Sequence, residues 1–450
     1  MTITTIRFPR PRLARPAGLA LAAGIVLAGT ALLRSGDAPS PVVATPDLGA
    51  TVNAAPDRLP PAARVAFWEP RAASGSYLDL LFLADAYVER GRVTGDLGDL
   101  ERAAAALDRA APSAPDRAAV DVRRAGVAFS LHRFVEAAEI AERLVAADER
   151  NLAALGILGD ARLEVGDVDA ARRAYEQLGE LAPSPAVWSR QGRLAFLTGD
   201  PDGAERFVAR ALDAARADAF PDEIAFYATQ LADLRRLAGD LAGSEAAYAL
   251  ALGALPEHAP ALAGLGRLRE AQGRREEAVS LLSRSVELLP LPEVIATLAD
   301  LETLAGRPDR AADHLALVDR IGEVGQAVGT VYDRQLVLVA ADHGRDPERA
   351  VAMARAELQD RQDVYGWDAL AWALHAAGDL DAAADASRRA LALGTPDPRL
   401  RYHAGMIALA RGDRAAARPL LEAALAGRAA LPPLQVEALQ GALASLAARP

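Results

Sequence analysis

Apolar and polar residues follow a helical spacing along most of the chain, and the same arrangement returns at nearly regular intervals. Residues 365–398, YGWDALAWALHAAGDLDAAADASRRALALGTPDP, show one such unit: two Ala-rich segments flank Gly378, and a Pro-containing turn follows. In both segments apolar side chains fall at i, i+3 and i+4, which is one face of an amphipathic α-helix. The unit therefore predicts two helices joined at a glycine.

The glycine of this unit has counterparts at a nearly constant distance. In order they are Gly166, Gly199, Gly239, Gly273, Gly306, Gly344, Gly378 and Gly412, with intervals of 33, 40, 34, 33, 38, 34 and 34 residues. A fixed period near 34 residues indicates a repeat architecture. Gly91 and His132 mark two more degenerate copies, so about ten units are expected between residues 77 and 430.

The residues around each glycine predict how the two helices pack. The position seven residues before it is Ala or Gly in every unit except that of Gly344, which has Val337, and in four units it is glycine: Gly159, Gly192, Gly266 and Gly405. Such residues let two helix axes approach closely, so we expect them at the contact between helices. The turn glycine is expected to end the first helix in a left-handed conformation. Pro183, Pro256 and Pro290 are expected to end second helices.

The unit resembles the tetratricopeptide repeat (TPR). In residues 365–398, Trp367 takes the early Trp position, Leu370 and Ala371 the Leu-Gly position, and Ala383 and Ala390 the small positions of the second helix. Residues 155–178 and 187–212 match about as well. The resemblance implies an all-α fold, a right-handed superhelical α-solenoid of about ten TPR-like helix pairs whose first helices line an extended concave surface.

The repeat period also divides the chain. The solenoid is assigned to residues 63–450, with units near 77–116, 117–151, 152–184, 185–224, 225–258, 259–291, 292–329, 330–363, 364–397 and 398–431. Residues 432–450 are interpreted as a C-terminal capping helix. A helix over residues 62–72 is expected to pack on the first unit through Phe67 and Trp68. Extra residues after Gly91, Gly199 and Gly306 predict three places where the superhelix is lengthened or bent.

The N-terminus has the pattern of an export signal. Arg7, Arg10, Arg12 and Arg15 precede the apolar run 17–33, and Arg34 follows it. This arrangement predicts an uncleaved signal anchor over residues 1–34 with the following chain outside the cytoplasm. The alternatives are a cleaved signal peptide, which would release a secreted protein, and a buried helix. Residues 35–62, rich in Pro and Ala without periodicity, are interpreted as a disordered linker.

Composition excludes several functions. The chain has a formal net charge of -11, which argues against nucleic acid as a partner. With no cysteine there is no thiolate metal site and no cysteine nucleophile. No histidine forms an H-E-x-x-H pair, although His375 and His403 lie on first helices of adjacent units and could approach each other. No phosphate-binding loop or nucleophile elbow is present. We therefore expect no enzyme, no metal, no cofactor and no small-molecule substrate.

Two function classes remain. The first is a non-catalytic protein–protein interaction scaffold outside the cytoplasm that binds partner segments on its concave face. The second is an assembly or maturation factor, a chaperone-like adaptor for exported or envelope proteins, as some proteins with this repeat are. A stable stoichiometric partner would favour the scaffold, and a changing set of clients would favour the factor.

Two sets of residues are predicted to line the groove. The positions six residues before the turn glycines alternate in charge: Asp160, Arg193, Asp233, Arg267 and Asp300. Their alternative role is a ladder of ion pairs between stacked helices, which would set the register of the units. Near the C-terminus, a cluster of aromatic, His and Met side chains with one Asp is predicted to hold an apolar partner segment: Asp368, Trp372, Tyr402, His403 and Met406. The alternative is that the C-terminal helix covers this cluster.

Overall fold

The computed structural model describes residues 59–327 and 333–448, and all regular elements within these ranges are helices. The predictions for residues 1–34 and for residues 35–58 lie outside the described residues. Within the described ranges, no helix has both the length and the apolar character that a membrane span needs.

Twenty of the helices form ten consecutive pairs, as the repeat period predicts. The pairs are α2 (Tyr77–Thr94) and α3 (Leu97–Ala110), α4 (Arg117–Ser130) and α5 (Phe134–Ala147), α6 (Leu152–Glu164) and α7 (Val168–Leu181), α8 (Pro185–Leu197) and α9 (Pro201–Asp218), α10 (Pro221–Ala238) and α11 (Leu241–Ala254), α12 (Ala259–Ala271) and α13 (Arg275–Leu288), α14 (Pro292–Leu304) and α15 (Pro308–Ala327), α16 (Asp333–Asp342) and α17 (Pro347–Glu357), α18 (Val364–Ala376) and α19 (Leu380–Ala390), and α20 (Pro398–Ala410) and α21 (Arg414–Ala426).

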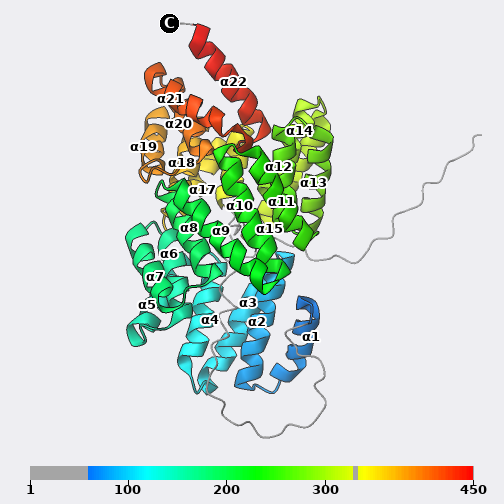
Figure 1. Ribbon diagram of the computed structural model, residues 1–450, viewed down its shortest axis with the longest axis vertical. Helices are drawn as coiled ribbons and strands as arrows, with labels where there is room; N and C mark the ends of the chain where they lie inside the picture. The colour runs from blue at the N-terminus through cyan, green and yellow to red at the C-terminus, as the bar shows by residue number, and fades with distance from the viewer. Residues whose placement is uncertain (1–58, 328–332, 449–450) are drawn as a thin grey trace, which may run out of the picture.

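Further helices stand at the two ends and in two connections. Helix α1 (Pro61–Ala72) packs on α2, where the ring of Trp68 stacks on Phe82 with centroids 4.7 Å apart, and Phe67 meets Trp68 edge-on. Helix α22 (Pro433–Ala448) follows the last pair. The short 3-10 helices η2 (Ala111–Ser113) and η3 (Arg428–Ala430) lie in the connections after α3 and α21. The solenoid is thus a helical repeat superhelix with an extra helix at each end (Figure 1).

The turn between the two helices of a unit is built by a glycine and the residue after it. All eight turn glycines adopt the expected left-handed conformation, with φ between 60° and 87°. In five units the next residue is an Asp that caps the second helix, because its carboxylate accepts a hydrogen bond from the backbone N–H three residues later. These caps are Asp167, Asp200, Asp240, Asp379 and Asp413. Helix propensity and turn chemistry therefore agree in these units.

Gly91 was assigned to the wrong position in the first unit. Helix α2 continues through Gly91 to Thr94, and Gly95, with φ of 71°, ends it instead. The other two insertions also lengthen helices. Helices α9 and α10 have 18 residues each, and α15 has 20. Extra residues extend the existing hydrogen-bonded ladders at these three places.

The predicted packing register is confirmed at the small positions of the first helices. A Cβ built on Gly159 would lie 2.3 Å from the Tyr175 ring, and one on Gly266 would lie 2.8 Å from Leu282. Gly192 and Gly405 face Val208 and Leu421 in the same way. Each pair of helices therefore packs a bulky side chain of the second helix against bare backbone of the first.

Units far apart in the sequence contact each other across successive turns of the superhelix. The turns that end α6, α8 and α10 lie against the chain after α17, after α19 and at the end of α21: Gly166 faces Gln362, Gly199 faces Gly394 and Gly239 faces Ala426. Figure 1 shows α17–α21 beside α8 and α10. Arg361 bonds to Glu164, 197 residues away, with Nε and Oε2 at 2.6 Å. Thr395 donates to the carbonyl of Leu197 at 2.6 Å, across 198 residues. We call this line of contacts the seam. The concave surface expected from the repeats is therefore partly covered, because units of one turn contact units of the previous turn along the seam.

Candidate functional site: a cavity on the inner face of the superhelix

Closure of the superhelix leaves a cavity of about 1300 Å³ on its inner face. The first helices α6, α8, α10, α12, α14, α16, α18 and α20 contribute to its wall, together with α5, η3 and α22. The wall combines apolar side chains such as Phe196, Leu234 and Leu338 with many arginines and carboxylates. The cavity is therefore amphipathic, and its charges come from residues that the closure brings together.

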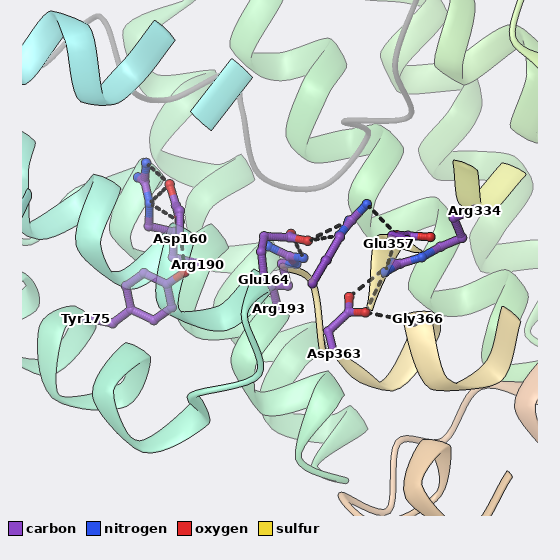
Figure 2. Close-up of polar contacts among 10 residues, drawn as sticks. Asp160, Glu164, Tyr175, Arg190, Arg193, Arg334, Glu357, Asp363 and Gly366 are labelled. Carbon is purple, nitrogen blue, oxygen red and sulfur yellow. Dashed lines mark hydrogen bonds and ion pairs between the residues drawn. The ribbon is translucent and has the colours of Figure 1, made fainter. Parts of the chain in front are cut away.

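Glu164, at the end of α6, is the junction of a buried chain of ion pairs in this wall (Figure 2). One carboxylate oxygen accepts from Arg193 of α8, and the other accepts from Arg361, which follows α17. Burial alone would raise the pKa of Glu164, but the charges of Arg361, Arg193 and Arg334 hold that pKa well below its usual range. Glu164 is thus fixed as an anion, and it joins two turns of the superhelix.

The chain of ion pairs continues through Arg334 of α16. Its Nη2 lies 2.9 Å from Oε1 of Glu357 and 2.6 Å from Oδ1 of Asp363. Asp363 is also the cap of α18, because it accepts from the backbone N–H of Gly366 at 2.8 Å (Figure 2). Three arginines and three carboxylates therefore balance each other along this part of the wall. Opposite charges in contact are the arrangement in which buried ions are tolerated. Nη1 of Arg193, Nε of Arg334 and Oε2 of Glu357 have no hydrogen-bond partner among the described residues.

A second buried pair lies beside this chain. Arg190 donates through Nε and Nη2 to the two oxygens of Asp160, both at 2.9 Å in the shortest contacts, and Tyr175 donates its hydroxyl to Asp160 at 2.8 Å (Figure 2). Burial and the charge of Asp160 raise the pKa of Tyr175. This cluster ties α6 to α7 and to α8, so it fixes neighbouring units relative to each other.

The five predicted groove residues divide into two groups. Arg193, Asp233 and Arg267 line the cavity. Asp160 and Asp300 are almost fully buried and do not belong to its wall. Burial raises the pKa of Asp300, which contacts Nε2 of His343 at 3.0 Å.

The predicted ladder of ion pairs between first helices is present in kind, but its partners differ from the predicted ones. Ion pairs do link neighbouring first helices, but each predicted residue pairs with a residue outside the predicted set. Arg193 pairs with Glu164, Arg267 with Glu293, and Asp160 with Arg190.

The predicted partner-binding cluster is buried. The Trp372 ring is stacked between the rings of His375 and His403, with centroids 4.6 and 4.2 Å away, and its Nε1 donates to Asp342 at 2.7 Å. Asp368 accepts from Nδ1 of His403 at 2.9 Å. The side chains of His375 and His403 are thus held apart by an indole ring.

Helix α22 covers this cluster. Nε2 of Gln435 donates to Asp342 at 2.8 Å and lies 3.2 Å from Nε2 of His403. Trp372 is 6% exposed, Tyr402 2%, and His403 0%. The expectation of exposed side chains is wrong for these residues and for Asp368, because the C-terminal helix packs on them. Met406 is partly buried against the same core. Binding of a partner by this cluster stays a prediction, and it requires α22 to move away.

Sequence reasoning missed most of the charged wall. Glu164, Arg334, Glu357, Arg361 and Asp363 have no distinguishing local pattern, and the two ends of the seam are separated by 197 residues. Arg193 was found because its position in the repeat faces the concave side. Only the pitch of the superhelix brings the other residues to it.

These observations define a class: an all-helical repeat protein whose superhelix has a charged cavity on its inner face. Family comparison specifies the repeat. Two tetratricopeptide-repeat models match residues 88–151 and 128–194. The chain therefore contains tetratricopeptide repeats, and the recognised stretch includes α6 and α8 of the cavity wall.

Solved structures of helical repeat proteins are similar over parts of the chain. PilW, a type IV pilus biogenesis factor, is 18% identical over 46% of this chain and 94% of its own, with a TM-score of 0.38. A thermophilic TPR protein of Thermus thermophilus, TTC0263, is 20% identical over 46% of this chain and all of its own, with a TM-score of 0.37. A human IFIT1 dimer with PPP-AAAA is 14% identical over 80% of this chain and 94% of its own, with a TM-score of 0.46. The search of curated proteins gave no match.

Proposed function

We propose that this protein is a non-catalytic protein–protein interaction scaffold that holds a segment of its partner inside the cavity. The single observation that supports this most is the cavity itself, whose volume of about 1300 Å³ lies on the inner face of a tetratricopeptide-repeat superhelix. Sites for small molecules usually enclose about 300–1,000 Å³. The larger volume and the mixed apolar and charged wall suit a polypeptide segment.

The ionisation of the wall supports a binding role over a catalytic one. A general acid or base needs a pKa near the working pH. Glu164 is held far below that range by its arginines, and Arg193 and Arg334 are kept protonated by their carboxylates. These groups are committed to one another through ion pairs and exchange no protons near neutral pH.

The proposed location is outside the cytoplasm, with the chain anchored through residues 17–33 or secreted after cleavage. The support is the excess of arginine before this apolar run. A reporter fused after residue 50 tests it and is expected to be active only outside the cytoplasm. Activity confined to the cytoplasm would contradict the proposal. A mature N-terminus between residues 30 and 50 would contradict the uncleaved anchor but would still support export of the protein.

The cavity is tested by filling it. Ala356, near the end of α17, lines the cavity, and Ala352 lies one turn earlier on the same helix without lining it. Both are exposed, so Trp is tolerated at either position without disturbing the core. The tagged full-length chain is used to isolate the partner from the native host, and the purified partner is then titrated against each variant.

We expect Ala356→Trp to weaken partner binding at least tenfold and Ala352→Trp to bind like the wild type. Equal binding by all three proteins would disprove the proposal. The isolated partners also separate the two function classes. One stoichiometric partner supports the scaffold, and a changing set of clients supports the assembly or maturation factor.

A further inference from the structure

The first turn of α22 is held by side chains from three first helices. The backbone N–H of Leu434 donates to the carboxylate of Asp300 on α14. The amide nitrogen of Gln435 donates to Oδ1 of Asp342 on α16 at 2.8 Å and points at Nε2 of His403 on α20, 3.2 Å away. The start of a helix has N–H groups without partners inside the helix, and here other units supply an acceptor. We call α22 docked when these three contacts are made.

His403 takes part in this docking only in its neutral form. Its Nδ1 lies 2.9 Å from both oxygens of Asp368, and a carboxylate is an acceptor, so Nδ1 carries a proton. Its Nε2 faces the amide nitrogen of Gln435, which is a donor, so Nε2 has to be an unprotonated acceptor. A proton on Nε2 would place two donors against each other. Protonation of His403 is therefore incompatible with this contact to α22.

Rotation of the Gln435 amide does not accommodate the proton. The rotated amide would turn Oε1 toward His403, but Oε1 would then occupy the place from which the nitrogen donates to Asp342 at 2.8 Å. The same oxygen of Asp342 already accepts from Nε1 of Trp372 at 2.7 Å. In the present orientation Oε1 of Gln435 is buried and has no hydrogen-bond partner among the described residues. One contact of α22 is thus lost in either orientation, and a buried hydrogen bond left unmade costs stability.

The titratable and charged groups around His403 and the first turn of α22 come from five helices. They are Asp300 of α14, Asp342 and His343 of α16, Asp368 and His375 of α18, Arg399 and Tyr402 of α20, and Glu437 of α22. Burial, followed by the charge of His403, lowers the pKa of His375. Burial raises the pKa of Tyr402. These two side chains therefore stay neutral in mild acid.

Asp368 and His343 have opposite effects on a charged His403. Asp368 bonds to Nδ1 with or without α22 and so favours the charged ring in both states. The ring nitrogens of His343 contact the carbonyl of Val339 and a carboxylate oxygen of Asp300, both acceptors, so this ring is doubly protonated. Burial alone would lower the pKa of His343, but the hydrogen bond and the charge of Asp300 raise it. This positive charge and the complete burial of His403 oppose a second charge while α22 is docked.

We infer that α22 is a pH-sensitive latch, docked by neutral His403 and released when His403 is protonated, so that mild acid uncovers the predicted partner-binding cluster. This latch goes beyond the proposed function and does not depend on the cavity. Histidine is the side chain that ordinarily takes up a proton between about pH 5 and 8.

The sign of the pH dependence follows from which state binds the proton. A proton that binds better to the released state stabilises that state, so docking is complete above the ordinary titration range of histidine, near pH 6.5, and weakens below it by up to about tenfold for each pH unit. Asp300 acts in the same direction in stronger acid. Burial raises its pKa, and its protonation removes the acceptor of the Leu434 N–H.

The test measures the docking of α22 by hydrogen exchange in the full-length protein. Exchange is followed by mass spectrometry at pH 8 and pH 5.5, and each rate is compared with that of the same peptide in the unfolded chain, which removes the intrinsic effect of pH. Wild type is expected to lose about tenfold of the protection of α22 at pH 5.5, as one proton taken up one unit below the ordinary histidine value requires. Helices α6 and α11 are expected to keep their protection.

His403→Gln places an amide near the position of Nε2, where it accepts from Gln435 without titrating. Protection of α22 is then expected to be the same at both pH values. His375→Gln is the matched control, because His375 also stacks on Trp372 but makes no hydrogen bond with the described residues of α22. It is expected to retain the tenfold loss. Gln435→Met removes both amide donors at similar volume and is expected to lower protection at pH 8 and to lose most of the pH dependence.

The melting temperature of each variant is measured at both pH values. If His403→Gln does not fold, because Asp368 loses its donor, the inference is judged on Gln435→Met against His375→Gln. Three results would overturn the inference. Wild-type protection of α22 is equal at the two pH values, or the loss in His403→Gln is as large as in wild type, or α6 and α11 lose protection together with α22, which is general unfolding in acid.

Discussion

Two groups of turns in this solenoid have the same local structure and different surroundings. Gly166 and Gly239 are left-handed glycines whose Cβ position would lie 2.7 and 2.9 Å from carbonyl oxygens of Gln362 and Ala426, in the next turn of the superhelix. The second group has the same backbone conformation, but no atom lies within 4 Å of the Cβ position: Gly273, Gly306, Gly344, Gly378 and Gly412. The difference shows that one local motif serves both as a helix–helix turn and as a contact between superhelical turns.

The two groups also differ in what stabilises the units that carry them. Turns at the seam are joined to distant units by buried polar contacts such as that of Glu164 with Arg361. The unit with the free turn Gly378 is stabilised by its neighbours and by α22, through the stacked Trp372. Substitutions in the two regions are therefore expected to have different signatures.

The largest effect is expected at the seam. Glu164→Gln leaves the guanidinium of Arg193 without a carboxylate and leaves Arg361 only Glu357, at 3.5 Å, and breaking a buried pair in this way costs about 3–5 kcal/mol. The loss is measured by urea denaturation at pH 7. An unchanged free energy of unfolding in Glu164→Gln or in Arg361→Gln would show that these ion pairs do not stabilise the seam.

The pH dependence of the Glu164→Gln effect follows from the lowered pKa of Glu164. A carboxylate whose pKa is depressed by folding contributes stability above its unfolded pKa, about 4.3, and loses it as the pH falls toward the folded value. The difference between wild type and Glu164→Gln should therefore be complete at neutral pH and shrink only in strong acid. A difference that disappears between pH 7 and pH 6 would disprove this assignment.

A comparable loss is expected in the free-turn region from Trp372→Ala. The indole is 6% exposed and is stacked between two imidazoles, and truncation of a buried aromatic residue costs about 3–5 kcal/mol. A fall in melting temperature is the expected result. Preserved melting with reduced partner capture would instead support the predicted partner-binding role of the cluster with Asp368, Tyr402, His403 and Met406.

The comparison of turns is tested directly by Gly166→Ala and Gly378→Ala. Both substitutions place a Cβ in a left-handed conformation, which costs about 1–2 kcal/mol. Gly166→Ala additionally forces the Cβ against a carbonyl oxygen of the next turn, and overpacking of this kind adds about 1–3 kcal/mol. Thermal denaturation of the pair measures the difference. Equal destabilisation by the two substitutions would show that the seam accommodates the added Cβ without a loss of stability.

The smallest effect is expected inside a single unit. Gly266→Ala improves helix propensity but places a Cβ 2.8 Å from Leu282, so we expect a net loss of about 1 kcal/mol. Gly266→Leu should lose more, because the whole side chain has to fit the same contact. An unchanged melting temperature in Gly266→Leu would disprove the packing register.

Local features of the fold were predictable because they depend on residues close in sequence. The 34-residue period, the left-handed turn glycines and the prolines after α7, α11 and α13 each act within one unit. The candidate site was predictable only in part. Arg193, Asp233 and Arg267 were found from their position in the repeat, whereas the seam residues Glu164 and Arg361 gave no signal.

The sequence by itself determined ten helix pairs, their packing register and the side of each first helix that faces inward, because helix periodicity and turn chemistry are short-range. Only the tertiary structure decided which distant units meet at the seam and which residues line the cavity. Small rotations between units, with the lengthened helices α9, α10 and α15, accumulate until Arg361 reaches Glu164 and α22 covers Trp372. No single position encodes the sum of these rotations, so the cavity forms only when distant units of the superhelix come into contact.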